Sequence, residues 1–398
     1  MKNRLNLLLM ISSLYIANIS LAQVKEQTFE DYQKQESQNY QKYIEKETKA
    51  YEQYVKDEKD ALEKFRKEVE VYWGKGKFIS STQKDWVEYS KDKKSRTNVD
   101  FEKGIAKVEI ILSPKEADNP VLVQKKMEES IKRLVITKGN TKDFETASEK
   151  PKPIAKLPVL HGQLQTKGGK KVNAENADSF AKEVVKKEEI ISQNIKGSDG
   201  KERTKLTVSM ALAPNHIKIR AAEYQTEINK YAAKYDLPVE VVYAVIHTES
   251  YFNPKAKSNA PAYGLMQLVP KSGARDAYRY VYKKDRILAA NYLYKADNNI
   301  ELGTAYLHLL IARHFKKIKD PNSRILCAVA SYNTGAGNFA RAFTGKTDPK
   351  KAIPKINAMN YDELYIYLRK HLPYDETKDY IKKVSTRQRQ YHLWKDKI

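Results

Sequence analysis

The chain has 398 residues, which is long for one ordinary domain and predicts two or three folded units. Lys and Arg exceed Asp and Glu by 73 − 50 = 23, a surplus that attracts polyanions of several kinds. Because the positive residues are scattered among acidic ones, the composition does not favour a nucleic-acid-binding protein. The single cysteine, Cys327, excludes an internal disulfide framework, and its apolar neighbours indicate a buried side chain rather than a nucleophile.

The first 22 residues follow the pattern of a secretory signal peptide. Lys2 and Arg4 precede a mostly apolar run over 5–21, and small residues at 20–22 offer a cleavage site. The alternative is a membrane anchor, but the run is short and interrupted by polar residues. We therefore expect an exported, periplasmic protein. No cysteine lies near the cleavage site, so no lipid attachment is expected there.

Residues 23–73 predict one long charged helix, clearest over 27–72, where Gly and Pro are absent. Apolar pairs recur every eleven residues, close to three helical turns, and so form one nearly straight stripe. The pairs are Phe29/Tyr32, Tyr40/Tyr43, Tyr51/Tyr54 and Leu62/Phe65. Such a stripe needs a partner. Packing on its own domain and self-association are equally open, and an envelope protein is a further candidate partner.

Residues 74–213 predict a small α+β domain. Alternation and β-branched content favour strands at 86–89, 98–101, 105–112 and 206–212, and a helix is expected over about 121–134. Prolines and a glycine pair predict a long loop over 150–171.

Residues 214–398 predict an all-helical domain. Expected helices are His216–Tyr235, Pro238–Ser250, Asn299–Phe315, Ser323–Tyr332, Asp362–His371 and Asp375–Tyr391.

Glu249 is the first candidate catalytic residue. In its helix, Asp236 is placed to cap the start and Pro238 lies in the first turn. Val242, Val245 and Glu249 share one helix face, so the carboxyl is expected beside apolar packing, where burial raises its pKa. A carboxyl that stays protonated near neutral pH can act as a general acid. The alternative is a glutamate at a helix end that points into water.

Four short motifs occur in order along the chain, the first of them at the end of this helix. They are Glu249-Ser250, Gly264-Leu265-Met266-Gln267, the run at 330–335 (Ala-Ser-Tyr-Asn-Thr-Gly), and Tyr380. In these residues the chain resembles the lytic murein transglycosylases with a goose-lysozyme-like catalytic domain. The resemblance is collinear over about 215–390. Segments at 86–89, 98–104 and 210–216 look like the leader domain of the membrane-bound C-type members of that family. The missing lipobox cysteine and the tyrosine-striped helix depart from that type.

The resemblance implies a fold and a reaction. The fold is an α+β leader domain, preceded by the long helix and followed by an all-α lysozyme-like domain. Glu249 would protonate the glycosidic oxygen between N-acetylmuramic acid and N-acetylglucosamine, then act as base on the muramoyl C6 hydroxyl. The product would be a 1,6-anhydro sugar, formed on peptidoglycan strands without a cofactor or metal.

The resemblance also implies the substrate contacts. Gln267 and Asn333 would hydrogen-bond the sugar or its acetamido group. Tyr332 would line the cleft, and Tyr380 would point its hydroxyl towards Glu249. Weaker candidates are Met266, on a sugar face or in the core, and the hydroxyls of Ser250 and Ser331.

Two other functions stay open. One is a lysozyme-type hydrolase, for which Asp276 or Asp285 would be the acids to recruit. The other is an inactive wall-binding or scaffold protein, against which the intact motifs argue. The sequence does not distinguish endo from exo cleavage.

Overall fold

The computed structural model describes residues 29–146 and 149–394, so the predicted signal peptide at 1–22 lies outside the described residues. The chain divides into two compact units, residues 1–52 and 53–398. In the first unit, residues 29–52 are continuous helix, the beginning of α2 (Phe29–Trp73). The helix ends at Trp73, before Gly74 with its φ of 95°, as the sequence predicts.

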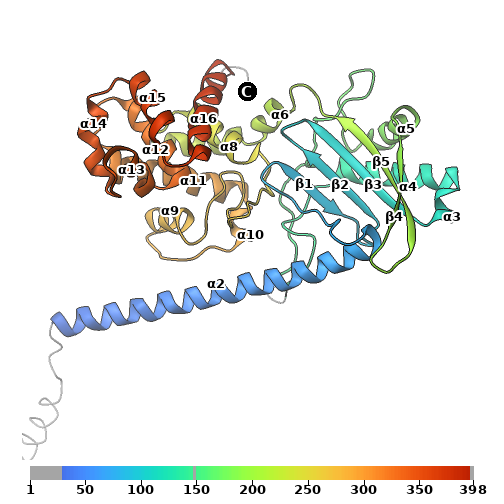
Figure 1. Cartoon of the computed structure of the whole chain (residues 1–398), viewed down its shortest axis with the longest axis horizontal. Helices are drawn as coiled ribbons and strands as arrows, with labels where there is room; N and C mark the ends of the chain where they lie inside the picture. Colours follow the sequence, from blue (N-terminus) through green and yellow to red (C-terminus); the bar gives the residue numbers. More distant parts are fainter. Residues whose placement is uncertain (1–28, 147–148, 395–398) are drawn as a thin grey trace, which may run out of the picture. The chain divides into compact units, whose positions relative to one another are not determined.

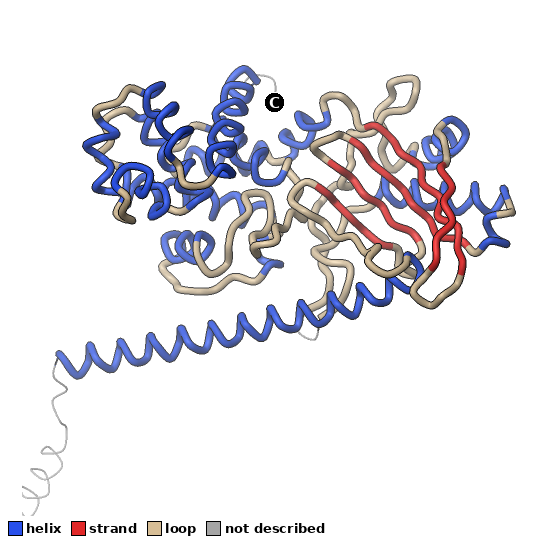
Figure 2. Tube along the Cα trace, viewed as in Figure 1, coloured by secondary structure: helices blue, strands red, loops and turns tan. Residues whose placement is uncertain are grey.

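The second unit contains an antiparallel sheet of five strands in the order β1-β2-β3-β5-β4 (Figures 1 and 2). The strands are β1 (Asp85–Tyr89), β2 (Ser95–Asp100), β3 (Ile105–Leu112), β4 (Ile191–Lys196) and β5 (Glu202–Ala211). The predicted strand at 105–112 matches β3 in full, whereas those expected at 98–101 and 206–212 begin three or four residues too late.

Both faces of this sheet are covered. Alternate residues of β3, among them Val108 and Ile110, face a core made with α4 (Pro120–Ile136) and α5 (Ala177–Lys187). Ile111 points the other way, into a smaller cluster with Phe65 and Trp73 of α2. For this end of α2 the structure confirms packing on its own domain.

The remainder of the second unit is helical. Its helices are α6 (His216–Glu223), α7 (Gln225–Lys234), α8 (Val239–Ser250), α9 (Gly273–Tyr282), α10 (Ala290–Leu293), α11 (Ala296–Leu310), α12 (Pro321–Thr334), α13 (Ala336–Thr344), α14 (Ile353–Asn357), α15 (Tyr361–His371) and α16 (Asp375–Trp394), besides α3 (Pro114–Ala117) beside the sheet. A π-helical turn, Ile311–Phe315, extends α11. The predicted all-α C-terminal part is therefore present.

Two predictions here were wrong. The expected helix over 216–235 breaks at Tyr224, whose ring is buried and stacks on Phe252 with centroids 6.3 Å apart. Asp236 does not cap α8; its φ is 52°, and the helix begins after Pro238 without a side-chain cap.

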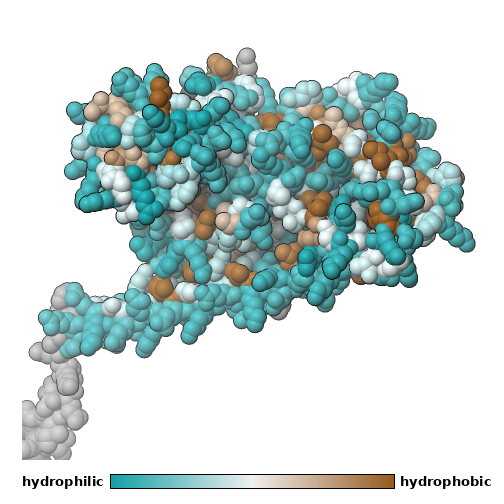
Figure 3. Space-filling view, viewed as in Figure 1, coloured by the Kyte–Doolittle hydropathy of each residue, from teal (hydrophilic) through white to brown (hydrophobic). Residues whose placement is uncertain are grey.

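The face shown in Figure 3 is largely hydrophilic, with apolar residues in small scattered patches. Within residues 29–146 and 149–394, no helix combines the length and apolar character that crossing a bilayer requires.

Candidate active site

Glu249 lies in the last turn of α8, a helix buried almost all round. Nine of its twelve residues are buried, including Val242 and Val245 on the face predicted for Glu249. Helix α16 packs along α8. The Glu249 side chain is therefore enclosed by the core, with only 9% of the residue exposed.

The environment of Glu249 favours its neutral form. Burial raises the pKa of this carboxyl to about 8, and the charge of Glu376 adds to the rise. One contact opposes it: the Tyr380 hydroxyl donates a hydrogen bond of 2.7 Å to Oε1 of Glu249. Burial and the nearby Glu249 charge hold the pKa values of Tyr332 and Tyr380 well above their usual range. Three of the sequence-predicted residues thus come together, with Glu249 and Tyr380 buried and Tyr332 partly buried.

Gln267 lies on the loop between α8 and α9. Its backbone has φ 46°, a left-handed conformation that is uncommon for a residue other than glycine. Its side-chain Nε2 donates to the carbonyls of Ala256 (3.0 Å) and Gly264 (2.9 Å). Its Oε1 is buried and has no hydrogen-bond partner among the described residues. The amide is therefore fixed by the loop and retains one unused acceptor.

Asn333 and its neighbours lie at the end of α12. The Asn333 Oδ1 accepts a hydrogen bond of 2.7 Å from the Thr377 hydroxyl, which ties α12 to the first turn of α16. The hydroxyls of Ser331 and Thr334 are buried without a described partner. Unpaired buried polar groups cost about 1–3 kcal/mol each, so these two, like Gln267 Oε1, are places where a polar ligand would be stabilising.

Met266 does not lie where it could pack on a sugar face. Its side chain is fully buried and packs so closely on α11 that a Cβ at Gly303 would clash with it. Its carbonyl accepts a hydrogen bond of 2.7 Å from the Tyr332 hydroxyl. The structure therefore places Met266 in the core, the alternative open from the sequence.

Ser250 is also fully buried. Its hydroxyl donates to the carbonyls of Ile246 (3.0 Å) and Leu265 (2.8 Å). These bonds hold the end of α8 against the loop that carries Gln267. The Ser250 hydroxyl is therefore used inside the protein and is not exposed.

Asn299, on α11, organises the same loop and was missed by sequence reasoning. Its Oδ1 accepts from the Met266 backbone N–H (2.7 Å), and its Nδ2 donates to the carbonyls of Tyr263 (2.9 Å) and Leu293 (2.7 Å). Gly264 passes so near that a Cβ there would clash with the Asn299 amide. The sequence offered no distinct signal, because Asp297, Asn298 and Glu301 are also polar residues of the first half of α11.

Arg220 is a second residue that the sequence did not single out. It is fully buried on α6, and its guanidinium donates to the carbonyls of Tyr251 (3.1 Å) and Phe252 (2.5 Å). These two residues directly follow α8 and have φ values of 51° and 58°. Gln163 and the ring of Phe101, 3.5 Å away, hold the guanidinium from the sheet-containing part. Arg220 thus secures the chain turn immediately after Glu249.

The other candidate acids are engaged elsewhere. Asp285 forms a two-point ion pair with Arg275 (2.6 and 3.0 Å), and Asp276 lies 3.4 Å from Arg313. Glu376 is the carboxylate whose charge reaches Glu249. Its spacing of four from Tyr380 on α16 was the sequence signal that could have identified it.

No three His, Cys, Asp or Glu side chains of the described ranges gather in an arrangement that could hold a metal ion. Cys327 is fully buried, as its apolar neighbours predict, and burial raises the pKa of its thiol.

Known proteins resemble both parts of the chain. A sequence model described as the transglycosylase SLT domain matches residues 226–354, and one described as the N-terminal domain of membrane-bound lytic murein transglycosylase C matches residues 44–223. The transglycosylase C of Sodalis glossinidius is 30% identical over 325 residues, 81% of this chain and 87% of that protein. Its counterpart in Actinobacillus succinogenes is 28% identical over 326 residues, 82% of this chain and 86% of its own. Among solved structures, the 70 kDa soluble lytic transglycosylase of Escherichia coli is 22% identical over 45% of this chain and 26% of its own, with a TM-score of 0.35.

Proposed function

The chain belongs to the family of membrane-bound lytic murein transglycosylase C, and on that premise we propose that Glu249 carries out its reaction alone, without a water nucleophile. The enzyme is a lytic transglycosylase that acts on peptidoglycan. The proposed reaction cleaves the β-1,4 bond between N-acetylmuramic acid and N-acetylglucosamine and leaves a 1,6-anhydromuramoyl end.

The observation that carries this proposal is the buried Glu249 carboxyl with its raised pKa. A neutral Glu249 transfers its proton to the glycosidic oxygen as the bond from that oxygen to C1 breaks. The resulting carboxylate takes the proton of the muramoyl C6 hydroxyl, whose oxygen bonds to C1. That proton restores the neutral carboxyl of Glu249, and no water is consumed. The Tyr380 hydroxyl, 2.7 Å from Oε1, stabilises the carboxylate between the two steps.

Substrate contacts follow from the unused polar groups. Gln267 offers its Oε1 to an N–H or hydroxyl of the sugar, because its Nε2 is already engaged by the loop. Asn333 is proposed to bind through its amide N–H₂, since its Oδ1 accepts from Thr377. Tyr332 holds the Met266 carbonyl and contributes its ring to the site. We assign Ser250 and Met266 to support of these residues and not to the sugar.

The test is the product. We expect purified sacculi digested by the enzyme to release fragments with anhydro ends, detected by mass spectrometry. Glu249→Gln keeps the shape of the side chain and should abolish release. Glu240→Gln, on the same helix but with its side chain 17% exposed beside His392, is the matched control and should release normally.

Other products would support the rival functions. Fragments with reducing ends would show that the enzyme hydrolyses the bond with water. Glu376 would then be the second acid to examine, because its charge acts on Glu249. Absence of any release by the wild type would leave a wall-binding protein.

The location and partners of the enzyme are proposed from the same premise. The relatives are named membrane-bound, which supports an envelope location, and the N-terminal signal pattern supports export to the periplasm. The surplus of 23 positive charges concentrates the enzyme on an acidic cell wall. A protein partner for α2 remains a proposal.

A further inference from the structure

A cavity of about 410 Å³ opens on a different part of the second unit, and Glu249 does not line it. Its walls come from the middle of α2, the segments 78–83 and 141–144, the loop 255–263 and the region of α10. This volume falls in the range of pockets that bind small organic ligands. The walls combine aromatic side chains, such as Tyr54 and Tyr294, with amides, hydroxyls, three lysines and the carboxylates of Glu58 and Asp143.

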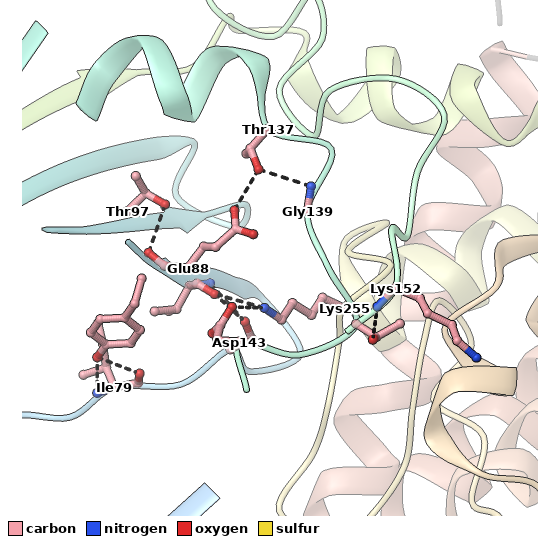
Figure 4. A network of polar contacts seen from close by, with 12 residues as sticks. Ile79, Glu88, Thr97, Thr137, Gly139, Asp143, Lys152 and Lys255 are labelled. Carbon is pink, nitrogen blue, oxygen red and sulfur yellow. Dashed lines mark hydrogen bonds and ion pairs between the residues drawn. The ribbon is translucent and has the colours of Figure 1, made fainter. Parts of the chain in front are cut away.

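Two of the three lysines are neutralised within the wall. The Lys142 ammonium lies 2.5 Å from Glu58. The Lys255 ammonium lies 2.9 Å from Asp143 and also donates to the Val87 carbonyl at 3.4 Å (Figure 4). The first pair joins α2 to the segment 141–144, the second joins the loop 255–263 to that segment, and neither cation is left for a ligand.

Lys257 is the cation that remains. No carboxylate of the described residues lies within ion-pairing distance of its ammonium, which sits 5.8 Å from the centroid of the Tyr263 ring. Glu58 acts on Lys257 only from farther away, and that carboxylate is already paired with Lys142. Burial lowers the pKa of Lys257, as expected for an ammonium that has lost water without gaining a counter-ion. An anionic ligand would supply that counter-ion.

Asn291, on α10, gives the cavity an unused donor. The residue is 8% exposed, and its Nδ2 has no hydrogen-bond partner among the described residues. A buried N–H₂ group without an acceptor costs about 1–3 kcal/mol. A carboxylate or a peptide carbonyl in the cavity would accept from it.

One loop joins this cavity to the catalytic group. Lys257 pairs with Tyr263 across a short antiparallel bridge, and Tyr263 pairs with Leu268. Gln267 donates to the carbonyl of Ala256, the residue directly before Lys257. A ligand held at Lys257 therefore lies along the same loop that positions Gln267.

We propose that this cavity binds a carboxylate of the peptide stem of the substrate, with Lys257 as counter-ion and Asn291 as hydrogen-bond donor. The proposal rests on the proposed function, because the stem is attached to the lactyl group of the muramoyl residue held at Glu249. An extended peptide advances about 3.3–3.6 Å per residue, so a stem of four residues spans at most about 14 Å, and the proposal requires Lys257 to lie within that reach of the muramoyl residue. A stem carboxylate supplies the counter-ion that Lys257 lacks.

The first test is direct binding of the free peptide L-Ala-γ-D-Glu-diaminopimelate-D-Ala to the full chain by isothermal titration calorimetry. Lys257→Met should weaken binding about tenfold or more, whereas Lys257→Arg, which keeps the charge, should retain most of it. Lys316→Met removes the same charge from an exposed residue that does not line the cavity and should bind as the wild type does. The fully amidated peptide should bind the wild type weakly and lose little more in Lys257→Met.

A second test uses cleavage. The ratio of kcat/KM for peptide-bearing over peptide-free glycan strands should fall about tenfold in Lys257→Met through KM. An unchanged ratio, a wild type that does not bind the free peptide at millimolar concentration, or equal binding by wild type and Lys257→Met would overturn the proposal. Failure of the proposed function can be told apart from failure of this proposal. If sacculi yield no anhydro products, the proposed function fails, whereas the peptide titration still measures whether the cavity binds the stem.

Discussion

Replacing Glu249 by Gln should make the protein more stable, and the gain should depend on pH. The usual pKa of a glutamate is near 4.5, whereas burial raises that of Glu249 to about 8 in the folded protein. The folded state therefore binds this proton more tightly than the unfolded state. By linkage, the free energy of unfolding of the wild type falls as pH rises from about 4.5 to about 8, and this group adds no further change outside that window.

The size of the effect follows from the shift. One pKa unit corresponds to about 1.4 kcal/mol, so the rise to about 8 sets a ceiling of about 5 kcal/mol above pH 8. Gln does not titrate, and its Oε1 can still accept from the Tyr380 hydroxyl. The stability difference between Glu249→Gln and wild type should thus be small at pH 4, grow through neutral pH and level off above pH 8.

Thermal unfolding followed by calorimetry at half-unit intervals from pH 4 to 9 measures this difference. Glu240→Gln, on the same helix with a partly exposed side chain, is the control and should show no comparable growth. A Glu249→Gln difference that stays flat across the window would refute the raised pKa, and with it the reason for assigning the proton-donor role to this carboxyl.

Three further predictions concern the support of Glu249. Tyr380→Phe removes a hydrogen bond to a charged carboxylate, which is worth about 1.5–3 kcal/mol, so kcat should fall about 10–150-fold. Because that bond lowers the pKa of Glu249, the alkaline limb of the pH–rate profile should move to higher pH, and a limb that does not move would contradict the contact. Arg220→Met should lower both Tm and kcat, with kcat partly restored by Arg220→Lys; full activity in a folded Met variant would exclude a positioning role. Met266→Ala should cost about 2–5 kcal/mol of stability measured by denaturant unfolding, whereas a change confined to KM would return the side chain to the sugar face.

The sequence predicts the site best where local pattern and chemistry coincide. Glu249 could be placed on a buried face because Val242 and Val245 precede it at helical spacing, and both are fully buried. The motif around Met266 and Ser250 located a functional loop, but not which side chains point out of it. That direction depends on α11, which fills one side of the loop with Asn299 and leaves Met266 in the core.

Elements without periodicity were the ones missed. Strand β4 has the polar sequence Ile191–Lys196 and is mostly exposed at the edge of the sheet, so no alternation of apolar residues marks it. The sequence did not identify Arg220 for a related reason. A charged residue on a helix is expected to face water, and only the carbonyls of Tyr251 and Phe252, supplied by tertiary contact, make its burial favourable.

The segment after Glu249 is bound by the sheet-containing part. The Tyr251 hydroxyl donates to Glu102 at 2.6 Å, and Asn253 donates to the carbonyls of Thr82 and Asp85, each at 3.2 Å. Lys255 follows with its ion pair to Asp143. Tyr251, Asn253 and Lys255, three alternate residues, are thus bound by the preceding domain, and the first of them belongs to the turn that Arg220 holds. Because Asn253 and Lys255 are buried, loss of their partners on the sheet-containing part would leave a buried polar group unpaired close to the end of α8. The leader domain is accordingly in direct contact with the segment that continues the chain from Glu249.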